Sequence, residues 1–385
     1  MRTVLILGAG FGGLELATLL SRSLAEEVRV VLVDRNDSFT FGFAKLEILF
    51  RDVAPEAVRV PYADLAHPGV EFRREEVTEI DPRTRRVVTD RSEYEPDILV
   101  VALGADYDPA ATPGFVEDGY EYYSIEGAAR LRDRLDSFDG GSVVMAILRV
   151  PFKCPPAPYE GAMLLHEKLA RRGLGGNTRI RMISPMDSPI PVSADTSAAL
   201  VEALTRRGIE YTPGQLVHGL DPDRHVALTR AGDIAYDLFI GIPAHRVPAV
   251  VEASGLTVGG TDGWVAVDPA TLETPYPNVY ALGDCADAPV PRAGVFAEDA
   301  ARTVAAGIAA KLRGSDATDR YRGRGACHIE FGDGLVGKVD ADFLSGPAPR
   351  APFTAPSVAL AREKAEAAAA RIQRWFPGSL DRASE

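Results

Sequence analysis

The sequence lacks an excess of basic charge and any long apolar run. Its 42 Lys and Arg stand against 55 Asp and Glu, for a net charge of −13, whereas nucleic acid requires a basic face. No apolar run reaches the ~18 residues of a membrane-spanning helix. Met1 leads straight into the strand Val4–Leu7 with no secretory leader. We therefore expect no nucleic acid partner and a cytoplasmic chain.

Cysteine is also scarce. The three cysteines, Cys154, Cys285 and Cys327, are an odd number and lie far apart, which excludes a secreted disulfide scaffold. None forms a Cys-x-x-Cys pair, so we expect no metal site. Each cysteine needs its own explanation.

The chain is long enough for two or three domains, with 385 residues of which 46% are hydrophobic. Residues 3–7 form an apolar strand, a glycine turn and a helix to about Ser23 follow, and the strand Val28–Val33 ends at Asp34. This strand–helix–strand unit predicts a parallel sheet.

A second unit of the same kind is inserted into the first. It contains predicted strands at Ser142–Leu148, Thr178–Ile183 and Leu238–Ile242 and predicted helices at Glu160–Arg172 and Ala194–Arg207. The first unit resumes at Asn278–Asp284, followed by a helix at Phe296–Leu312, two short strands at Cys327–Phe331 and Leu335–Val339, a loop at Pro347–Pro356 and a helix at Ser357–Phe376. We predict a first domain of residues 1–108 and 261–314, an inserted domain of residues 109–260 and a C-terminal region of residues 315–385.

The turn Gly8-x-Gly10-x-x-Gly13 has the spacing of a dinucleotide site. Gly8 permits the tight turn, Gly10 lets the backbone approach a pyrophosphate, and Gly13 lets helix and strand pack closely. Asp34 can hold ribose hydroxyls and disfavours a 2′-phosphate. The alternative is a glycine turn in some other α/β protein.

Two further segments point to FAD rather than NAD. The strand Asn278–Asp284 ends in Gly-Asp, and Leu99–Gly104 is a buried strand that ends in glycine. With the glycine turn, these segments resemble the three-part pattern of the two-dinucleotide-fold flavoprotein superfamily, in which the Asp binds the ribityl chain. The resemblance implies an α/β fold with two Rossmann-like domains plus a C-terminal α+β segment. It implies these cofactor-binding residues: Gly8, Gly10, Phe11, Gly12, Gly13, Asp34, Arg35, Val77, Gly104, Gly283, Asp284, Arg292, Ala293 and Gly294.

The inserted domain has no second glycine turn. Residues 149–160 read Arg-Val-Pro-Phe-Lys-Cys-Pro-Pro-Ala-Pro-Tyr-Glu, and no glycine lies between Ser142 and Glu160. Phosphate binding requires free backbone N–H groups, and proline has none. We expect an electron donor other than a pyridine nucleotide; the alternative is a degenerate nucleotide site that still works.

Cys154 occupies this loop. Lys153 and the following helix N-terminus are features that lower a thiol's pKa, and we expect that effect here. The alternative is a small buried hydrophobic residue. Cys327, in a predicted strand, has the same alternative.

Lys153–Glu160 resembles the first redox-cysteine segment of sulfide:quinone oxidoreductases and of flavocytochrome c sulfide dehydrogenase flavoprotein subunits. Cys327 is similar in position to their second redox cysteine, and Val290–Gly294 to their flavin-ring loop, where lysine commonly stands in place of Arg292. The family implies a disulfide beside the flavin that sulfide attacks, which gives a persulfide and a thiolate. It also implies that Glu160 is a general base; the alternative is a carboxylate that stabilises the helix dipole.

The sequence departs from this family at two positions. The third cysteine of many bacterial members is absent from Tyr120–Ser124, and the flavin-linking cysteine of the flavocytochrome subunits is absent from Phe39–Ala44. We therefore expect non-covalent FAD. We interpret Cys285 as structural.

The chain should oxidise sulfide or a small thiol or persulfide and reduce a quinone or a protein acceptor. The rival interpretations are a type-II NADH dehydrogenase-like quinone reductase and a non-enzymatic, FAD-holding redox sensor. The last helix has apolar residues Leu360, Ile372, Trp375 and Phe376. These side chains could pack within the chain, contact a homodimer mate, or touch the inner membrane face peripherally.

Overall fold

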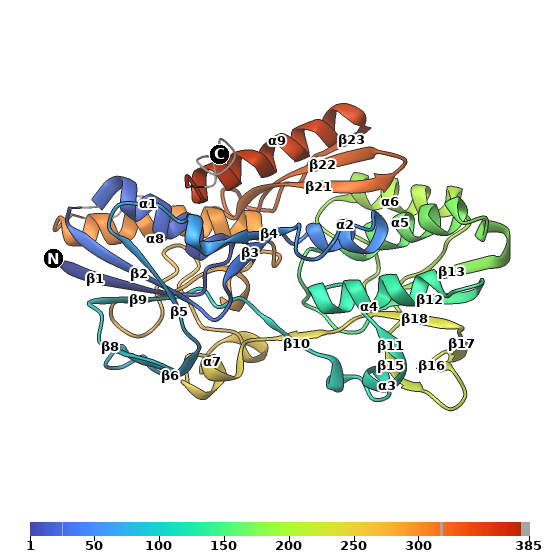
Figure 1. The fold of residues 1–385 in the computed structure, drawn as a ribbon, viewed down its shortest axis with the longest axis horizontal. Coiled ribbons are helices and arrows are strands. Elements are labelled where there is room, and N and C mark those ends of the chain that lie inside the picture. Colours follow the sequence, from blue (N-terminus) through green and yellow to red (C-terminus); the bar gives the residue numbers. More distant parts are fainter. Residues whose placement is uncertain (25, 316–318, 379–385) are drawn as a thin grey trace.

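Two α/β domains lie side by side beneath a C-terminal layer in the computed structural model, which describes residues 1–24, 26–315 and 319–378 (Figure 1). The first domain is built on a parallel five-stranded sheet in the order β20-β9-β1-β2-β5. Its strands are β1 (Arg2–Leu7), β2 (Val28–Asp34), β5 (Val70–Arg74), β9 (Ile98–Val101) and β20 (Val279–Ala281).

The apolar run of β1 is buried on both faces, as expected of a central parallel strand. Val4 and Ile6 pack against α1 (Phe11–Leu24) and α8 (Gly294–Leu312), whereas Leu5 and Leu7 belong to a second core cluster on the opposite face. That cluster includes residues of β6 (Val77–Asp81), β7 (Arg86–Thr89) and α7 (Ala249–Ala253). The other elements attached to this domain are β3 (Ser38–Thr40), β4 (Arg59–Pro61) and β8 (Glu93–Tyr94). The helix α2 (Ala44–Phe50) reaches across instead, and its Leu46, Ile48, Leu49 and Phe50 pack in the core of the inserted domain.

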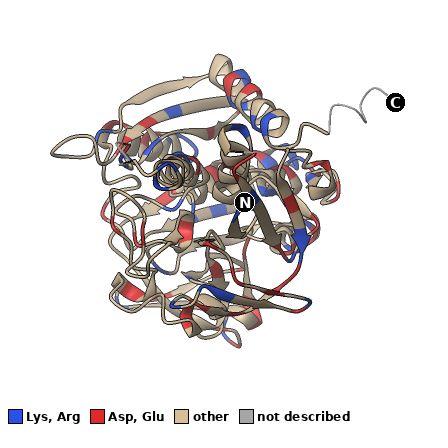
Figure 2. Cartoon of the chain, turned by 90° about the vertical axis from the view of Figure 1, so that its left-hand side faces the viewer, with Lys and Arg blue, Asp and Glu red and all other residues tan. Residues whose placement is uncertain are grey.

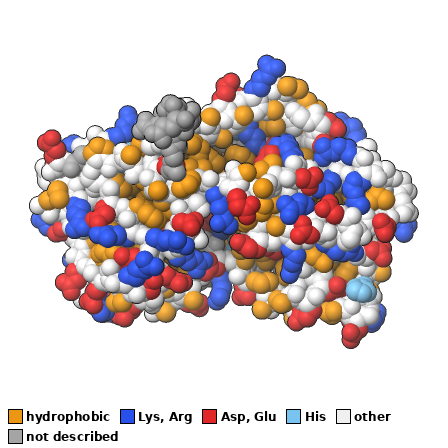
Figure 3. Space-filling view, viewed as in Figure 1, with side chains coloured by type: hydrophobic (Ala, Val, Ile, Leu, Met, Phe, Trp, Pro, Cys, Tyr) orange, Lys and Arg blue, Asp and Glu red, His pale blue; other side chains and the backbone are white. Residues whose placement is uncertain are grey.

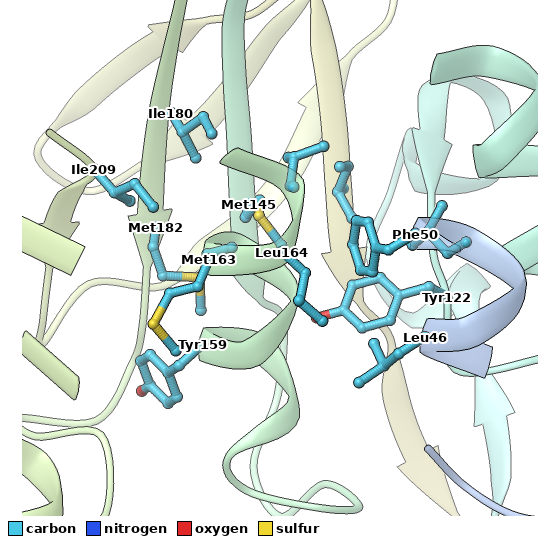
Figure 4. Packing of buried hydrophobic residues seen from close by; sticks show 14 of the residues in the cluster. Leu46, Phe50, Tyr122, Met145, Tyr159, Met163, Leu164, Ile180, Met182 and Ile209 are labelled. Atoms are coloured by element: carbon cyan, nitrogen blue, oxygen red, sulfur yellow. The ribbon is translucent and has the colours of Figure 1, made fainter. Parts of the chain in front are cut away.

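The inserted domain repeats the plan with a parallel sheet in the order β11-β18-β12-β13-β14. Figure 4 shows the core between this sheet and α5, where Met145, Met163 and Met182 meet. Its elements are α3 (Phe115–Asp118), β11 (Gly119–Tyr120), α4 (Ile125–Asp136), β12 (Gly141–Ile147), α5 (Ala157–Arg171), β13 (Thr178–Ile183), α6 (Ala194–Arg206), β14 (Glu210–Thr212), β15 (Val217–Asp221), β16 (Val226–Thr229), β17 (Gly232–Ala235) and β18 (Leu238–Ile242).

An antiparallel pair, β10 (Asp106–Asp108) and β19 (Ala244–Arg246), carries the chain between the two domains. Beyond β19, Val247, Val251 and Leu256 pack in the core of the first domain. We therefore propose that the chain returns to the first domain near residue 247, earlier than residue 260.

The C-terminal layer consists of β21 (Arg324–Gly332), β22 (Leu335–Asp342), β23 (Phe353–Ser357) and α9 (Val358–Trp375). The expected loop Pro347–Pro356 is in part wrong, because β23 begins at Phe353. Pro356 lies at the register shift of this edge strand, where a missing N–H is tolerated. The helix α9 spans the top of the molecule in Figure 1.

Candidate active site

A cavity of about 910 Å³ connects the glycine turn of the first domain with the cysteines. All three parts of the chain line it, because the carboxyl ends of β1 and β9 and the β12–α5 loop face the underside of β21 and α9. The predicted cofactor residues that line it are Gly8, Gly10, Phe11, Gly12, Asp34, Arg35, Val77, Gly104, Gly283, Asp284, Arg292, Ala293 and Gly294, together with Cys154, Cys327 and Glu160. Gly13 lies outside this lining.

The glycine turn has the close contacts that its spacing predicts. Gly8 has φ +102°, and a Cβ there would lie 2.3 Å from the Ala102 carbonyl oxygen. A Cβ on Gly13 would lie 1.9 Å from the Gly8 carbonyl oxygen, so helix α1 can approach β1 only without a side chain. A Cβ on Gly10 would meet no atom within 4 Å, so this backbone is open to a ligand.

Asp34 connects the turn to the end of β2. Its Oδ2 accepts the Ala9 N–H at 2.8 Å, and its Oδ1 accepts the Asn36 N–H at 2.9 Å. A carboxylate has about four acceptor positions, so Asp34 keeps capacity for ribose hydroxyls. The first N–H groups of α1 have no partner within their helix and suit a pyrophosphate. These residues fit an adenine dinucleotide.

The far end of the cavity holds Asp284 and the loop before α8. Burial raises the pKa of Asp284, and Lys153, Arg292 and Lys45 oppose that shift. The Arg292 guanidinium lies 3.6 Å from the Trp264 ring centroid and donates to the Asp284 carbonyl at 3.1 Å. These groups fit the ribityl chain and ring system of FAD.

The first N–H groups of α5 are bonded to carbonyls of the loop that precedes the helix. At the start of α5, the N–H of Ala157 bonds to the Cys154 carbonyl, and those of Tyr159 and Glu160 bond to the Pro156 carbonyl. Amides bonded in this way are not available to phosphate.

Cys154 is held between the two domains. It has φ +52°, and its N–H donates to the Arg292 carbonyl at 2.7 Å. Its side chain is exposed, and it lines the cavity together with the half-buried Cys327 of β21. Both thiols are unpaired in this structure, as is Cys285. Cys154 and Cys327 therefore line the same cavity, as predicted for a pair, but they are not joined by a disulfide.

The expected low pKa of Cys154 is wrong. Although the side chain is exposed to the cavity, the protein around it removes much of its hydration and raises its pKa well above the ordinary value, and the charges of Glu160 and Cys327 add to the effect. Lys153 does not offset this shift, because its ammonium donates to the Ala105 carbonyl and lies 4.6 Å from the Tyr107 ring centroid. Lys153 is next to Cys154 in the sequence, but it is not a cation that stabilises the Cys154 thiolate.

Glu160 lies in the first turn of α5 with 3% of its surface exposed. Its Oε1 accepts the backbone N–H of Glu330 in β21 at 2.8 Å. Burial raises its pKa to about 7, although Lys364 and the Glu330 N–H oppose the shift. The carboxyl thus bonds across to another element, and its pKa suits a group that exchanges protons near neutrality.

The sequence interpretation missed the cations of α9. Lys364 and Arg371 line the cavity, although we read this helix mainly for its apolar residues. Their seven-residue spacing, with alanines between them, places both on one helix face. That pattern could have indicated that two cations of this helix face the interior of the protein.

The apolar residues of α9 pack within the chain. Leu360, Trp375 and Phe376 are buried, and the Trp375 indole donates to Glu15 at 2.7 Å. These three side chains are therefore not free for lipid or a second copy. On the face in Figure 3, hydrophobic side chains gather where this layer meets the first domain.

Cys285 is fully buried in the core of the first domain, and its thiol contacts the Val101 and Leu282 carbonyls. Within the described residues, no helix is long and apolar enough to span a bilayer. The same residues contain no cluster of three metal-ligating side chains. Lys and Arg are interspersed with Asp and Glu along the elements seen in Figure 2.

The fold and this site define a two-domain flavoprotein oxidoreductase. A family model for pyridine nucleotide-disulphide oxidoreductases matches residues 2–147 and 159–307. The chain belongs to this family and is an FAD-dependent oxidoreductase. The match is interrupted at residues 148–158, the segment that contains Cys154.

Individual relatives agree with the resemblance seen in the sequence. The chain is 24% identical over 371 residues to the mitochondrial sulfide:quinone oxidoreductase of Mus musculus, covering 91% of this chain and 80% of that protein. The solved structure of the sulfide:quinone oxidoreductase from Aquifex aeolicus superposes with a TM-score of 0.87 at 22% identity, covering 98% of this chain and 92% of that one. An NADH dehydrogenase-like protein of Mycobacterium tuberculosis is 33% identical over 299 residues, covering 75% of this chain and 74% of that protein.

Proposed function

We propose that the chain oxidises sulfide, or a small thiol or persulfide, through Cys154 and Cys327 and passes the electrons to a quinone or a protein acceptor. The observation that carries this proposal is the common cavity, which brings a loop thiol, a strand thiol and a carboxyl with a pKa of about 7 together at the FAD site.

The two thiols work as a pair. In the oxidised state they form a disulfide, which hydrosulfide attacks. One S–S bond forms to the incoming sulfur and the Cys154–Cys327 bond breaks, which leaves a persulfide on one cysteine and a thiolate on the other. Glu160 in its carboxylate form takes the proton of the incoming H₂S. A second sulfide or small thiol takes the outer sulfur of the persulfide, which returns that cysteine to its thiolate. FAD, when bound, would supply the two-electron chemistry that reoxidises the two cysteines to the disulfide.

FAD is held without a covalent link. Asp34 and the open turn at Gly10 receive the adenosine pyrophosphate, and Asp284 receives the ribityl chain. Residues 39–44 contain no cysteine, so acid precipitation should release all flavin into the supernatant. Flavin that stays with the polypeptide would contradict this.

A pyridine nucleotide:quinone reductase is the second candidate, favoured by the 33% identity to the mycobacterial NADH dehydrogenase-like protein. Two features argue against this candidate: the loop before α5 is rich in proline, and the first N–H groups of α5 are already bonded to loop carbonyls.

An anaerobic titration separates the two candidates. The flavin absorbance of the purified protein is followed during additions of sulfide and, in a separate sample, of NADH. Bleaching by stoichiometric sulfide and not by NADH supports the proposal. The reverse result would replace it with the NADH-dependent reaction.

A further inference from the structure

Trp264 is a buried aromatic residue that supports the loop before α8 from behind. Its side chain is 3% exposed and packs in the first-domain core that also contains Cys285. Trp264 lies outside the cavity lining, but the guanidinium of Arg292, a residue that lines the cavity, lies 3.6 Å from its ring centroid. A cation within about 6 Å of an aromatic ring centroid is attracted to the ring, and Trp is the strongest partner. Trp264 can therefore act on the site through Arg292.

The backbone next to Trp264 is fixed to the segment that follows Asp284. The Val265 N–H donates to the Cys285 carbonyl at 2.9 Å, and the Asp287 N–H donates to the Val265 carbonyl at 2.8 Å. The indole ring is thus held at a set position relative to Asp284, at the end of the cavity that fits the ribityl chain.

Arg292 connects three parts of the site. Its Nε donates to the Asp284 carbonyl at 3.1 Å, and its guanidinium stacks on Trp264. Its own carbonyl accepts the Cys154 N–H at 2.7 Å, and residues 153 and 292 pair in a parallel bridge. Cys154 belongs to the inserted domain, whereas Trp264, Asp284 and Arg292 belong to the first domain. Arg292 therefore joins the FAD end of the cavity to the thiol across the domain boundary.

The contacts that hold the Arg292 guanidinium do not neutralise its charge. A backbone carbonyl and an indole ring are neutral groups, unlike Glu298, which pairs with Arg371. A guanidinium that stacks on an aromatic face keeps donors at its edge. Arg292 can thus offer both positive charge and N–H groups to the anionic cofactor.

We propose that Trp264 is a positioning residue for both halves of the site. By stacking on the guanidinium it fixes Arg292, so that the side chain of Arg292 serves the cofactor while its carbonyl holds the backbone of Cys154. This inference rests on the proposed function for the roles of FAD and Cys154.

The first test is the rate at which the holoprotein releases FAD on dilution, followed by the rise in flavin fluorescence. Trp264→Leu should release FAD about tenfold faster, because it removes the ring face under the cation. Trp264→Phe keeps a ring face and should stay close to the wild-type rate. Arg292→Met should also speed release, and the double variant Trp264→Leu/Arg292→Met should be no faster than Arg292→Met, since effects that pass through one residue do not add.

The second test is hydrogen exchange at the Cys154 amide, resolved by mass spectrometry with fragmentation. Trp264→Leu and Arg292→Met both leave the Arg292 carbonyl in the chain, but each releases the side chain that fixes it. Exchange at Cys154 should therefore rise at least about tenfold in both variants. The amides of β12, in the same domain as Cys154, serve as the internal reference and should keep wild-type rates.

Leu256→Ala is the matched control for loss of packing. Leu256 is buried in the same core cluster as Trp264 and also lies outside the cavity lining. This variant should lower the unfolding temperature and leave FAD release and Cys154 exchange at wild-type levels. Equal changes in Leu256→Ala, additive effects in the double variant, or a Trp264→Phe variant as impaired as Trp264→Leu would overturn the assignment. If Trp264→Leu does not fold, Arg292→Met decides, and wild-type exchange at Cys154 in that variant overturns the proposal.

Both measurements are independent of turnover. If Cys154→Ser still supports sulfide-driven flavin reduction, the proposed function fails whatever the rates of FAD release and amide exchange are. If both cysteines prove essential while the Trp264 and Arg292 variants act additively, only the inference about Trp264 fails.

Discussion

The loop between β1 and α1 and the loop between β12 and α5 occupy equivalent places in two similar sheets, yet they present different chemical groups. We call them the first and the second junction. After β1, Gly8–Gly13 leaves N–H groups unspent and the backbone at Gly10 open. After β12, the Cys154 N–H donates to the Arg292 carbonyl, the Cys154 and Pro156 carbonyls accept N–H groups of α5, and the loop presents a thiol. Equivalent places at the ends of parallel strands thus present different groups, an open backbone at Gly10 and a thiol at Cys154.

The difference arises from which backbone groups are free. Glycine allows a ligand to approach the main chain, whereas proline removes donors and fixes φ. A rigid loop with several prolines offers few donors to a dinucleotide, but it can hold a side chain at a set position. The experiments below break or sharpen this comparison, beginning with the largest expected effect.

Replacing the thiols tests the second junction most directly. Cys154→Ser and Cys327→Ser should each abolish flavin reduction by sulfide, because one sulfur accepts the incoming atom and the other leaves. The double variant should be little worse than either single one, since residues that act as a unit are not additive. Stopped-flow absorbance measures the rates.

Cys285→Ala is the matched control for those variants. Its thiol is buried in the first-domain core, so most activity should remain. Normal rates in either Cys154→Ser or Cys327→Ser would show that the thiols are structural.

The loop after β12 should not bind a dinucleotide as the loop after β1 is proposed to do. NADH and NADPH at micromolar concentration should reduce the flavin at least about 10²-fold more slowly than sulfide does, because phosphate-binding N–H groups are missing from the start of α5. Rapid-mixing experiments with each donor give the comparison. Equal rates would mean that the proline-rich loop still binds a nucleotide.

Glu160→Gln tests the carboxyl that follows the second junction. Sulfide-driven flavin reduction should slow by ~10²-fold, within the usual range for a general base. In the wild type the rate should rise as the pH passes about 7, where the carboxyl ionises. Stopped-flow rates from acid to mildly alkaline pH should rise more steeply in the wild type than in the variant, in which only the ionisation of H₂S remains.

The same variant gives a separate result for stability. Because the pKa of Glu160 is higher in the folded protein than its ordinary 4.5, its contribution is present below the unfolded value and is lost as the pH rises through about 7. Thermal unfolding should therefore show Glu160→Gln to be more stable than wild type above that pH and similar well below it. A large loss of stability with an unchanged rate would favour the helix-dipole role.

Gly13→Ala should give the smallest effect. The added Cβ would clash with the Gly8 carbonyl, and relief of such overpacking costs roughly 1–3 kcal/mol. Weaker FAD retention on gel filtration and a lower unfolding temperature should follow. Ala157 at the start of α5 already has a Cβ, and Ala157→Gly should leave FAD retention unchanged. Full retention in Gly13→Ala would mean that α1 tolerates a wider approach to β1.

The order of strands and helices was largely readable from the sequence, because buried parallel strands such as Val4–Leu7 and Leu238–Ile242 are continuous apolar runs. Thr178–Ile183 and Leu238–Ile242 agree with β13 and β18 residue for residue. The helix α5 begins three residues before Glu160, since Pro156 can cap it without an N–H. Short edge elements such as β23 carry no such pattern and were missed.

The electrostatics of the site could not be read in this way. Lys153 precedes Cys154 in sequence, yet it bonds to the Ala105 carbonyl. The cation whose charge lowers the pKa of Cys154, against the larger effect of burial, is Lys364, more than two hundred residues away in the sequence. Such pairings depend on how α9 packs over the cavity, and this long-range packing leaves no local signal in the sequence.

The position of α9 has a consequence for biosynthesis. During translation, the glycine turn, Cys154, the loop at Arg292 and Cys327 are all synthesised before α9. Domains generally fold in the order of their synthesis, so a nascent chain can form both sheets while its thiols still face open solvent. The cavity gains its last wall only when α9 leaves the ribosome and docks over β21 and β22. The proposed sulfur chemistry therefore requires that translation has passed this helix.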